Sequence, residues 1–397
     1  MARWRKVVFP TFGVLFILFF FAPIFRVTAQ LSTGDHLAEP GFWPTQSAQY
    51  RKDFVGAETC ATCHATIFAS QKSTPMGATA MHAENSEILH SHPNMDFGFG
   101  PFHYSLKVQA DQTGYAVTDG KETQTANLQW AFGTGRVGQS YLFKKRGEAF
   151  YEARVTYFSS LHNLNFTPAR AMTSAKDVAL NDAMYREVGA AEVGRCFACH
   201  TTASAIDGKF DEANLIPGVS CEACHGPGAE HVAAMRTAKV TGESGGSTQI
   251  FNPASLHPPD SVDFCGACHA TTWDVKLSGI KGVSTARSQP YRLQKSKCWG
   301  NGDARLTCIG CHDPHKQLQM ESTAYDANCL SCHSGSAKIQ AAGSQGQKMD
   351  MHAGKTCPVA TKNCVSCHMP KVDVPEMHYA FTDHWIRVLR PGETYRD

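Results

Sequence analysis

The chain has few charged residues and no strong excess of either sign. Only 18% of its 397 residues are charged, and the 37 Lys and Arg residues nearly balance the 35 Asp and Glu residues. Nucleic-acid-binding domains usually carry a strong basic excess, so the composition argues against nucleic acid as a partner. It also argues against a long disordered tail of one charge. The 16 cysteines are too dilute for a small disulfide-held scaffold, yet unusually many for a cytosolic enzyme.

Long hydrophobic runs are equally scarce, and the one that stands out is at the N-terminus. A basic start precedes an apolar run over residues 7–25, and Val27 and Ala29 then occupy the small-residue positions of a cleavage site. This layout predicts a secretory signal peptide over residues 1–29 and a soluble periplasmic or extracellular mature protein. Because the run is long for a signal peptide, an uncleaved membrane anchor through residues 7–25 is the alternative.

Against this background the motif Cys-x-x-Cys-His occurs seven times. Its cysteines are Cys60, Cys63, Cys196, Cys199, Cys221, Cys224, Cys265, Cys268, Cys308, Cys311, Cys329, Cys332, Cys364 and Cys367. Its histidines are His64, His200, His225, His269, His312, His333 and His368. Two thiols one helical turn apart add to the two haem vinyl groups, and the adjacent histidine reaches the iron. The motifs therefore predict seven covalently bound haem c groups.

Two other interpretations of the motif are weaker. A zinc site would pair Cys-x-x-Cys units without requiring a histidine beside each one. A thioredoxin-like redox dithiol would occur once, near a βαβ pattern. Seven repetitions of the complete motif favour haem attachment over both.

The sequence also supplies enough residues for a second ligand on every iron. Twelve histidines lie outside the motifs, and seven irons need at most seven distal ligands. Their sequence contexts favour His231, His315, His352, His378 and His384 over the others. Met76 is a candidate thioether ligand, or alternatively a packing residue under the first haem.

Two cysteines, Cys298 and Cys357, belong to no motif. In an oxidising compartment two spare thiols most often form a disulfide. A thiolate ligand to a haem or another metal is the alternative.

The motif spacing predicts how the chain is organised. The first motif stands alone, and the other six crowd into residues 196–368, which leaves little room for an ordinary hydrophobic core. The porphyrins must then provide much of the buried apolar surface. We therefore expect a mainly α fold with little regular structure, packed around stacked haems. Its predicted divisions are the signal peptide (1–29), a first haem segment (30–94), a β-rich insert (95–168) and a six-haem cytochrome domain (169–397).

The insert is predicted from residues whose apolar side chains alternate between turn signals. This pattern predicts a small antiparallel sheet. Its strands are expected at His103–Val108, Tyr115–Thr118, Leu128–Phe132, Ser140–Phe143 and Ala149–Phe158.

Longer strings around the motifs resemble a known group of proteins. They include Val55–Cys60, Thr74–Gly77, Cys221–His231, Cys311–His315, Cys367–Pro370 and Phe381–His384. In these strings the chain resembles the multihaem cytochromes c related to the tetrahaem electron acceptor of hydroxylamine oxidoreductase, and more narrowly the heptahaem exported type. The resemblance covers nearly all of the mature chain, although the tetratricopeptide repeats that accompany some such proteins are absent.

This resemblance implies roles for particular residues. It implies that Cys298 and Cys357 belong together. It leaves Met76 or His82 for one remaining iron. The distal ligands that it implies are His103, His231, His315, His352, His378 and His384.

The function expected from these features is electron relay through a chain of closely packed, mostly bis-histidine haems. The partners would be redox proteins acting as donor and acceptor, or an extracellular acceptor. One alternative is a reductase or dehydrogenase of a small nitrogen or sulfur oxyanion with one open haem. No Cys-x-x-Cys-Lys site, the signature of pentahaem nitrite reductases, supports that alternative. A second alternative is an oligomer or conductive filament, in which an exposed sheet edge pairs with another copy.

Overall fold

The computed structural model describes residues 51–110, 112–145, 147, 149–206, 209–241, 249–299, 306–334, 356–390, 393 and 395. All of them belong to one unit of internal contacts, residues 31–397. The predicted signal peptide or anchor and the candidate ligand His352 lie outside the described residues. Among the helices that are described, none combines the length and the apolar character needed to cross a membrane.

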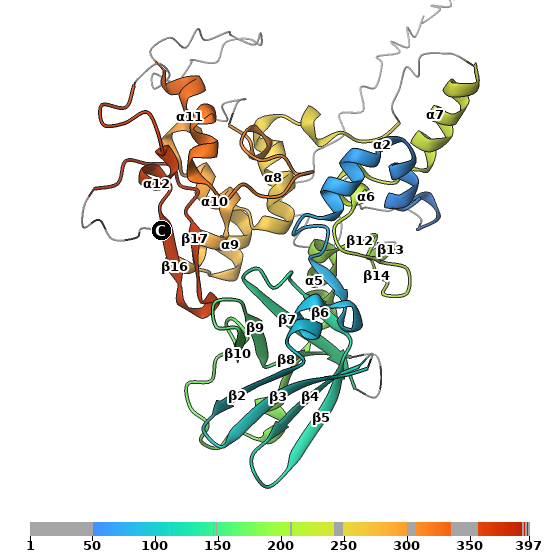
Figure 1. Cartoon of the computed structure of the whole chain (residues 1–397), viewed down its shortest axis with the longest axis vertical. Coiled ribbons are helices and arrows are strands. Elements are labelled where there is room, and N and C mark those ends of the chain that lie inside the picture. The colour runs from blue at the N-terminus through green and yellow to red at the C-terminus, as the bar shows by residue number, and fades with distance from the viewer. Residues whose placement is uncertain are drawn as a thin grey trace, which may run out of the picture. The chain divides into compact units, whose positions relative to one another are not determined.

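The architecture mixes helices with antiparallel sheets (Figure 1). Helices account for 40% of the structure and strands for 24%, so the predicted mainly α fold with little regular structure is wrong. The sheets are also larger than a small insert, because two of them contain seven and four strands and extend from Ala80 to Val188. The alternating apolar residues between the first and second motifs form sheets that are more extensive than the insert expected over residues 95–168.

The larger sheet has the order β1-β6-β7-β8-β11, with β9 added to β7 and β10 to β9. Its strands are β1 (Ala80–His82), β6 (Trp130–Phe132), β7 (Gly138–Lys144), β8 (Phe150–Ala153), β9 (Val155–Phe158), β10 (Asn163–Phe166) and β11 (Tyr185–Val188). The four-stranded sheet is β2 (Asn94–Phe99), β3 (Phe102–Gln109), β4 (Gln112–Thr118) and β5 (Thr123–Leu128). Three two-stranded sheets pair β12 (Thr201–Thr202) with β15 (Ile216–Pro217), β13 (Ala205–Ile206) with β14 (Lys209–Phe210), and β16 (Lys371–Val374) with β17 (Tyr379–Thr382).

The helices are mostly short. The α-helices are α2 (Ala57–Lys72), α3 (Glu87–Ser91), α4 (Leu180–Met184), α5 (Ala190–His200), α6 (Cys221–His225), α7 (Ala229–Thr241), α8 (Pro258–His269), α9 (Thr272–Ser278), α10 (Gln289–Gln294), α11 (Asp326–His333) and α12 (Cys364–His368). The 3-10 helices are η1 (Arg51–Asp53), η2 (Ala83–Asn85), η3 (Pro253–Ser255), η4 (Gly282–Arg287), η5 (Lys297–Trp299), η6 (Cys308–Gly310), η7 (Ser322–Tyr325) and η8 (Pro375–Met377).

Most of the predicted strands are present. The strand expected at His103–Val108 is β3, which buries Phe102, Tyr104 and Leu106 on one face. Such alternation is what a strand with one buried face requires. The strand expected at Ala149–Phe158 is divided into β8 and β9, and the one expected at Leu128–Phe132 is divided between β5 and β6.

The hydrophobic core belongs to the sheets. Two clusters of packed apolar side chains are present, and both draw only on residues between Met81 and Leu215. The second cluster packs Trp130, Phe150 and Phe197 together, so it joins the larger sheet to α5. The motifs from α6 onward contribute nothing to either cluster, although individual apolar residues such as Val262 are buried there.

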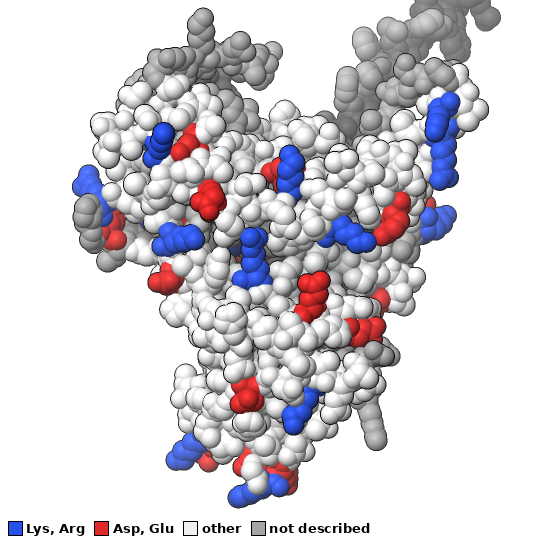
Figure 2. All heavy atoms as spheres, viewed as in Figure 1, with Lys and Arg blue, Asp and Glu red and all other residues white. Residues whose placement is uncertain are grey.

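The surface is sparsely charged. On the face drawn in Figure 2, basic and acidic side chains are scattered and mixed, and neither sign covers a large area. This face therefore offers no broad field of one sign to steer a charged partner.

Candidate functional site

The seven Cys-x-x-Cys-His motifs lie on short helical segments. Five of them end a helix at their histidine, in α5, α6, α8, α11 and α12. The first lies inside α2, which kinks at His64, and the fifth begins in η6. Helical residues three apart share a face, so the two thiols of a motif lie on the same side with the histidine just beyond. This arrangement suits two thioether bonds and a proximal iron ligand.

Motifs that are distant in sequence are neighbours in the structure. α2 contacts α6, α8 contacts both α5 and η6, and α11 contacts α12. The Cys60 thiol lies beside that of Cys221, and the Cys265 thiol lies beside that of Cys308. Among the described side chains, no three His, Cys, Asp or Glu residues converge as direct ligands for a metal ion.

Three motif histidines use Nδ1 to contact the main chain. The Nδ1 atoms of His225 and His368 each lie 2.9 Å from a carbonyl oxygen, those of Phe251 and Arg387. The Nδ1 atom of His200 lies 2.7 Å from Thr79 Oγ1 and 3.2 Å from the Thr79 carbonyl oxygen. An Nδ1–H that donates to a carbonyl fixes the tautomer and leaves Nε2 to bind a metal.

Burial favours the neutral form of these imidazoles. It lowers the pKa values of His200, His225, His269 and His312 below their ordinary value. It also lowers the pKa of His384, a predicted distal ligand, to about 4. Metal binding requires a neutral imidazole, so all five side chains are in the correct state at pH 7.

Two motif histidines face a predicted distal histidine. The ring centroids of His225 and His315 are 6.1 Å apart with planes 9° from parallel, and those of His312 and His384 are 6.2 Å apart at 44°. A metal–imidazole bond of about 2 Å, plus about 1 Å from nitrogen to ring centre, places two trans imidazole centroids about 6 Å apart. Either spacing would accommodate an iron, which His225 of the third motif or His312 of the fifth would then hold.

Neighbouring groups support each of these distal histidines. The main-chain N–H of His315 donates to Asp313 Oδ1 at 3.0 Å, and its Nδ1 lies 3.4 Å from the same oxygen. The Ser70 hydroxyl of α2 donates to the His315 carbonyl at 2.6 Å. The Nδ1 of His384 lies 3.0 Å from the Thr382 carbonyl oxygen. In both cases Nε2 would be left to hold an iron.

Two other predicted distal ligands lie away from the motifs. His103 is on the exposed face of β3, where it lines a hollow of about 330 Å³ with Asn94 and Lys107. The His378 ring packs on Phe158 with centroids 4.7 Å apart, and its carbonyl accepts a hydrogen bond from Ser160. Among the described contacts, neither His103 nor His378 meets a motif residue. His231, a third predicted distal ligand, lies on α7 near the ring of His225.

Met76 and His82 occupy different surroundings. The half-buried Met76 accepts a hydrogen bond from Val219 N–H through its carbonyl, two residues before the third motif. The chains approach closely here: Gly218 has φ 75°, and a Cβ on it would lie 2.0 Å from the Gly77 carbonyl oxygen. His82 is exposed, and its ring lies against that of Trp130 with centroids 4.1 Å apart and planes tilted by 32°. The structure thus places the main chain of Met76 beside the segment that precedes the third motif.

The two cysteines outside the motifs lie in different surroundings. No disulfide joins Cys298 and Cys357 in the structure. Cys298 is half-buried near Cys329 of the sixth motif, and Cys357 is exposed. The disulfide between them stays a prediction.

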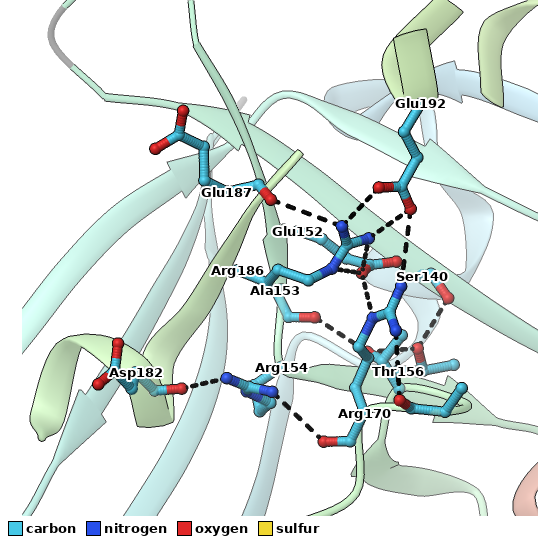
Figure 3. Close-up of polar contacts among 12 residues, drawn as sticks. Ser140, Glu152, Ala153, Arg154, Thr156, Arg170, Asp182, Arg186, Glu187 and Glu192 are labelled. Carbon is cyan, nitrogen blue, oxygen red and sulfur yellow. Dashed lines mark hydrogen bonds and ion pairs between the residues drawn. The ribbon is translucent and has the colours of Figure 1, made fainter. Parts of the chain in front are cut away.

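An ion-pair network fixes the second motif to the larger sheet (Figure 3). Arg186 of β11 pairs with Glu152 of β8 and with Glu192 of α5, each at 2.7 Å. Arg170 joins the same two carboxylates at 3.2 and 3.6 Å. Burial, and then Glu152 and Glu192, raise the pKa of the nearby Cys196 thiol to about 12.

Two buried carboxylates beside the motifs were not predicted as functional. Glu222, inside the third motif, is 1% exposed and accepts hydrogen bonds from the main-chain N–H groups of Val55, Gly56 and Gly228. Asp383 is fully buried beside His384 and pairs with Arg292 and Arg387. Burial opposes its ionisation, but hydrogen bonds from Arg292, Trp385 and Arg387 outweigh burial and lower its pKa. In the sequence, Glu222 could have been noticed because it is an acidic residue between two haem-attaching cysteines. The sequence around Arg292 gives no comparable indication of its role.

Comparison with known proteins agrees with the motif chemistry. The family model "Cytochrome c554 and c-prime" matches residues 157–226, a segment that contains the second and third motifs. No curated protein matches the chain. Among solved structures, the chain is similar to the outer cell wall cytochrome OcwA, with 15% identity and a TM-score of 0.47 over 85% of this chain and 80% of that one. The family match supports a multihaem cytochrome of the c type.

Proposed function

We propose that this chain is an exported seven-haem c-type cytochrome that relays electrons between redox partners. Each haem c supplies a one-electron redox centre when bound. The Cys-x-x-Cys-His motifs hold these centres on short helices, and the contacts between helices bring the motifs together. The relation to the tetrahaem acceptor of hydroxylamine oxidoreductase, the export route and the count of seven all belong to this proposal.

The observation that carries it is the pair His225 and His315. Their nearly parallel rings, 6.1 Å apart, suit two strong ligands on one iron. A second strong ligand closes the iron to substrate and favours electron transfer over catalysis. The pair His312 and His384 has nearly the same separation, 6.2 Å, at another motif, with the ring planes 44° apart.

The partners are proposed from the same chemistry. They would be a donor and an acceptor redox protein, or an extracellular acceptor. Two features support export. One is the N-terminal sequence, and the other is covalent attachment, which retains haem outside the cytoplasm. A filament or other oligomer would require self-association, which sedimentation of the purified protein measures.

Electron paramagnetic resonance of the oxidised holoprotein tests the proposal, with the haem count fixed by mass spectrometry. We expect seven haems, all low-spin, and rapid electron transfer from the reduced protein to a small oxidised c-type cytochrome. One high-spin haem would contradict the relay and favour the reductase alternative, which assays with nitrite, hydroxylamine and tetrathionate would then examine. A mass with fewer than seven haems would contradict the motif interpretation itself.

A further inference from the structure

Asp383 and Arg292 form a fully buried ion pair between segments that are 91 residues apart. Both side chains are 0% exposed. Arg292 Nε donates to Oδ1 and its Nη2 to Oδ2, both at 2.8 Å, so the guanidinium and carboxylate meet through two parallel bonds. The Trp385 N–H donates to Oδ1 at 3.0 Å, and Arg387 Nη1 donates to Oδ2 at 2.6 Å. The carboxylate thus accepts four hydrogen bonds.

This cluster connects several elements that carry motifs. Arg292 belongs to α10, which packs against α8 and therefore against the fourth motif. The Asp383 N–H donates to the carbonyl of Pro370, two residues after the seventh motif. The guanidinium of Arg292 also lies over the rings of Trp385 and Tyr395, at 5.0 and 4.4 Å.

From the carboxylate, one branch leads to His384. His384 is the next residue in the chain, and its carbonyl accepts a hydrogen bond from Ser296 Oγ at 3.3 Å. The same Oγ accepts the N–H of Ile386 at 2.8 Å. These contacts hold the main chain on both sides of His384 while its ring faces His312.

A second branch leads to His368 through Arg387. The Arg387 carbonyl lies 2.9 Å from His368 Nδ1, and the Arg387 N–H donates to the His368 carbonyl at 3.2 Å. Its side chain is bound to Asp383. The same carboxylate therefore restrains the residue that orients the histidine of the seventh motif.

We propose that Asp383 is a positioning residue for the axial ligands of two irons: His384 opposite His312 in the fifth motif, and His368 in the seventh. Groups that hydrogen-bond to metal ligands set their orientation and basicity. A buried, fully hydrogen-bonded ion pair is well suited to impose one geometry. The inference rests on the proposed function only in requiring that these histidines bind haem iron.

The test is Asp383→Asn in the full-length holoprotein, with Asp373→Asn as the control. Asp373 is exposed on β16 of the same hairpin. We expect seven haems in both variants. In Asp383→Asn the paramagnetic resonance signals of two low-spin haems should shift or become high-spin, and the midpoint potentials of those two haems should rise because a buried negative charge is lost. A folded Asp383→Asn protein whose seven signals and potentials match the wild type would overturn the proposal, as would a uniform change in all seven.

Arg387→Met provides the second variant, and it decides the matter if Asp383→Asn does not fold. It removes the side-chain link between Asp383 and the residue that contacts His368, together with the contact of Arg387 Nη1 to the Trp385 carbonyl, and it leaves the pair of Asp383 and Arg292. One haem signal should change, and the signal assigned to His312 and His384 should not. Equal changes at both haems would contradict the inference that Asp383 acts on His384 and on His368 through separate contacts. Failure of the wild type to exchange electrons would refute the proposed function. The haem signals of the two variants would still test the role of Asp383 independently.

Discussion

The imidazoles of His225 and His315 face each other across 6.1 Å with their planes 9° apart. The two residues come from the third motif and from the segment after the fifth motif, so this contact joins two parts of the haem-attaching region. Ser70 of α2 donates to the His315 carbonyl, which adds the first motif helix to the same junction. One iron between these rings would thus be held by the third motif and by the segment that follows the fifth.

Substituting His315 tests this assignment. His315→Ala should convert one low-spin haem to high-spin, because the iron loses its sixth ligand. His315→Met should keep that haem low-spin and raise its midpoint potential, as methionine–histidine ligation does. The control is His90→Ala, since His90 is exposed and its Nε2 contacts the Glu84 carbonyl oxygen. If His315→Ala leaves all seven signals unchanged, His315 is not a ligand.

Glu222 should stabilise the junction between the first and third motifs. Its Oε1 accepts from Val55 and Gly228 N–H at 2.8 Å each, and its Oε2 accepts from Gly56 N–H at 2.9 Å. Glu222→Gln replaces one of these acceptors by an NH₂ group that faces a donor. We expect the free energy of unfolding to fall by about 1–3 kcal/mol, the cost of leaving a buried polar group unsatisfied.

Urea unfolding followed by circular dichroism measures this difference. Glu230→Gln is the matched control, because Glu230 is an exposed residue at the start of α7. Equal stability of the two variants would show that the three main-chain contacts of Glu222 contribute nothing.

Phe197 should be the main apolar anchor of the second motif. It is the residue after Cys196, it is 0% exposed, and its ring contacts those of Trp130, Phe150 and Phe210. Phe197→Ala should lower the free energy of unfolding by about 3–5 kcal/mol. Val365 holds the same position in the seventh motif and is only half-buried. Thermal unfolding of Val365→Ala should therefore show a loss of no more than about 1 kcal/mol, and similar losses in the two variants would contradict this account.

The sequence predicts the attachment chemistry well and its spatial arrangement poorly. Cys221, Cys224 and His225 are recognised from local spacing alone, because covalent attachment depends on residues within one turn of helix. The ring that lies 6.1 Å from that of His225 belongs to His315, 90 positions along the chain, and only the fold brings the two together. The position of His103 on the exposed face of β3 is likewise evident only from the fold.

The extent of the sheets was underestimated for a related reason. Short segments such as β1 and β11 have three or four residues each, too few to show a period on their own. They become strands because neighbouring strands supply hydrogen-bond partners, as β8 does for β11. Arg292 is equally inconspicuous in the sequence, because its importance comes from a carboxylate 91 residues away.

The network around Arg186 predicts how stability depends on pH. A hydrogen bond from Arg186 is the main cause that lowers the pKa of Glu192 below its ordinary value of 4.5. The folded-state pKa is thus below the unfolded one, so ionised Glu192 adds stability above about pH 4.5, and this is lost as the pH falls through the folded-state pKa. Its side chain is 35% exposed, so the contribution should be below about 1 kcal/mol.

Glu192→Gln should therefore be less stable than the wild type at pH 7 and approach it near pH 3. The control is Glu187→Gln, because the Glu187 side chain is exposed and points away from the network (Figure 3). Thermal unfolding at a series of pH values measures both variants against the wild type. A Glu192→Gln deficit that stays constant from pH 7 to pH 3 would show that packing, rather than the charge of Glu192, holds α5 on the sheet.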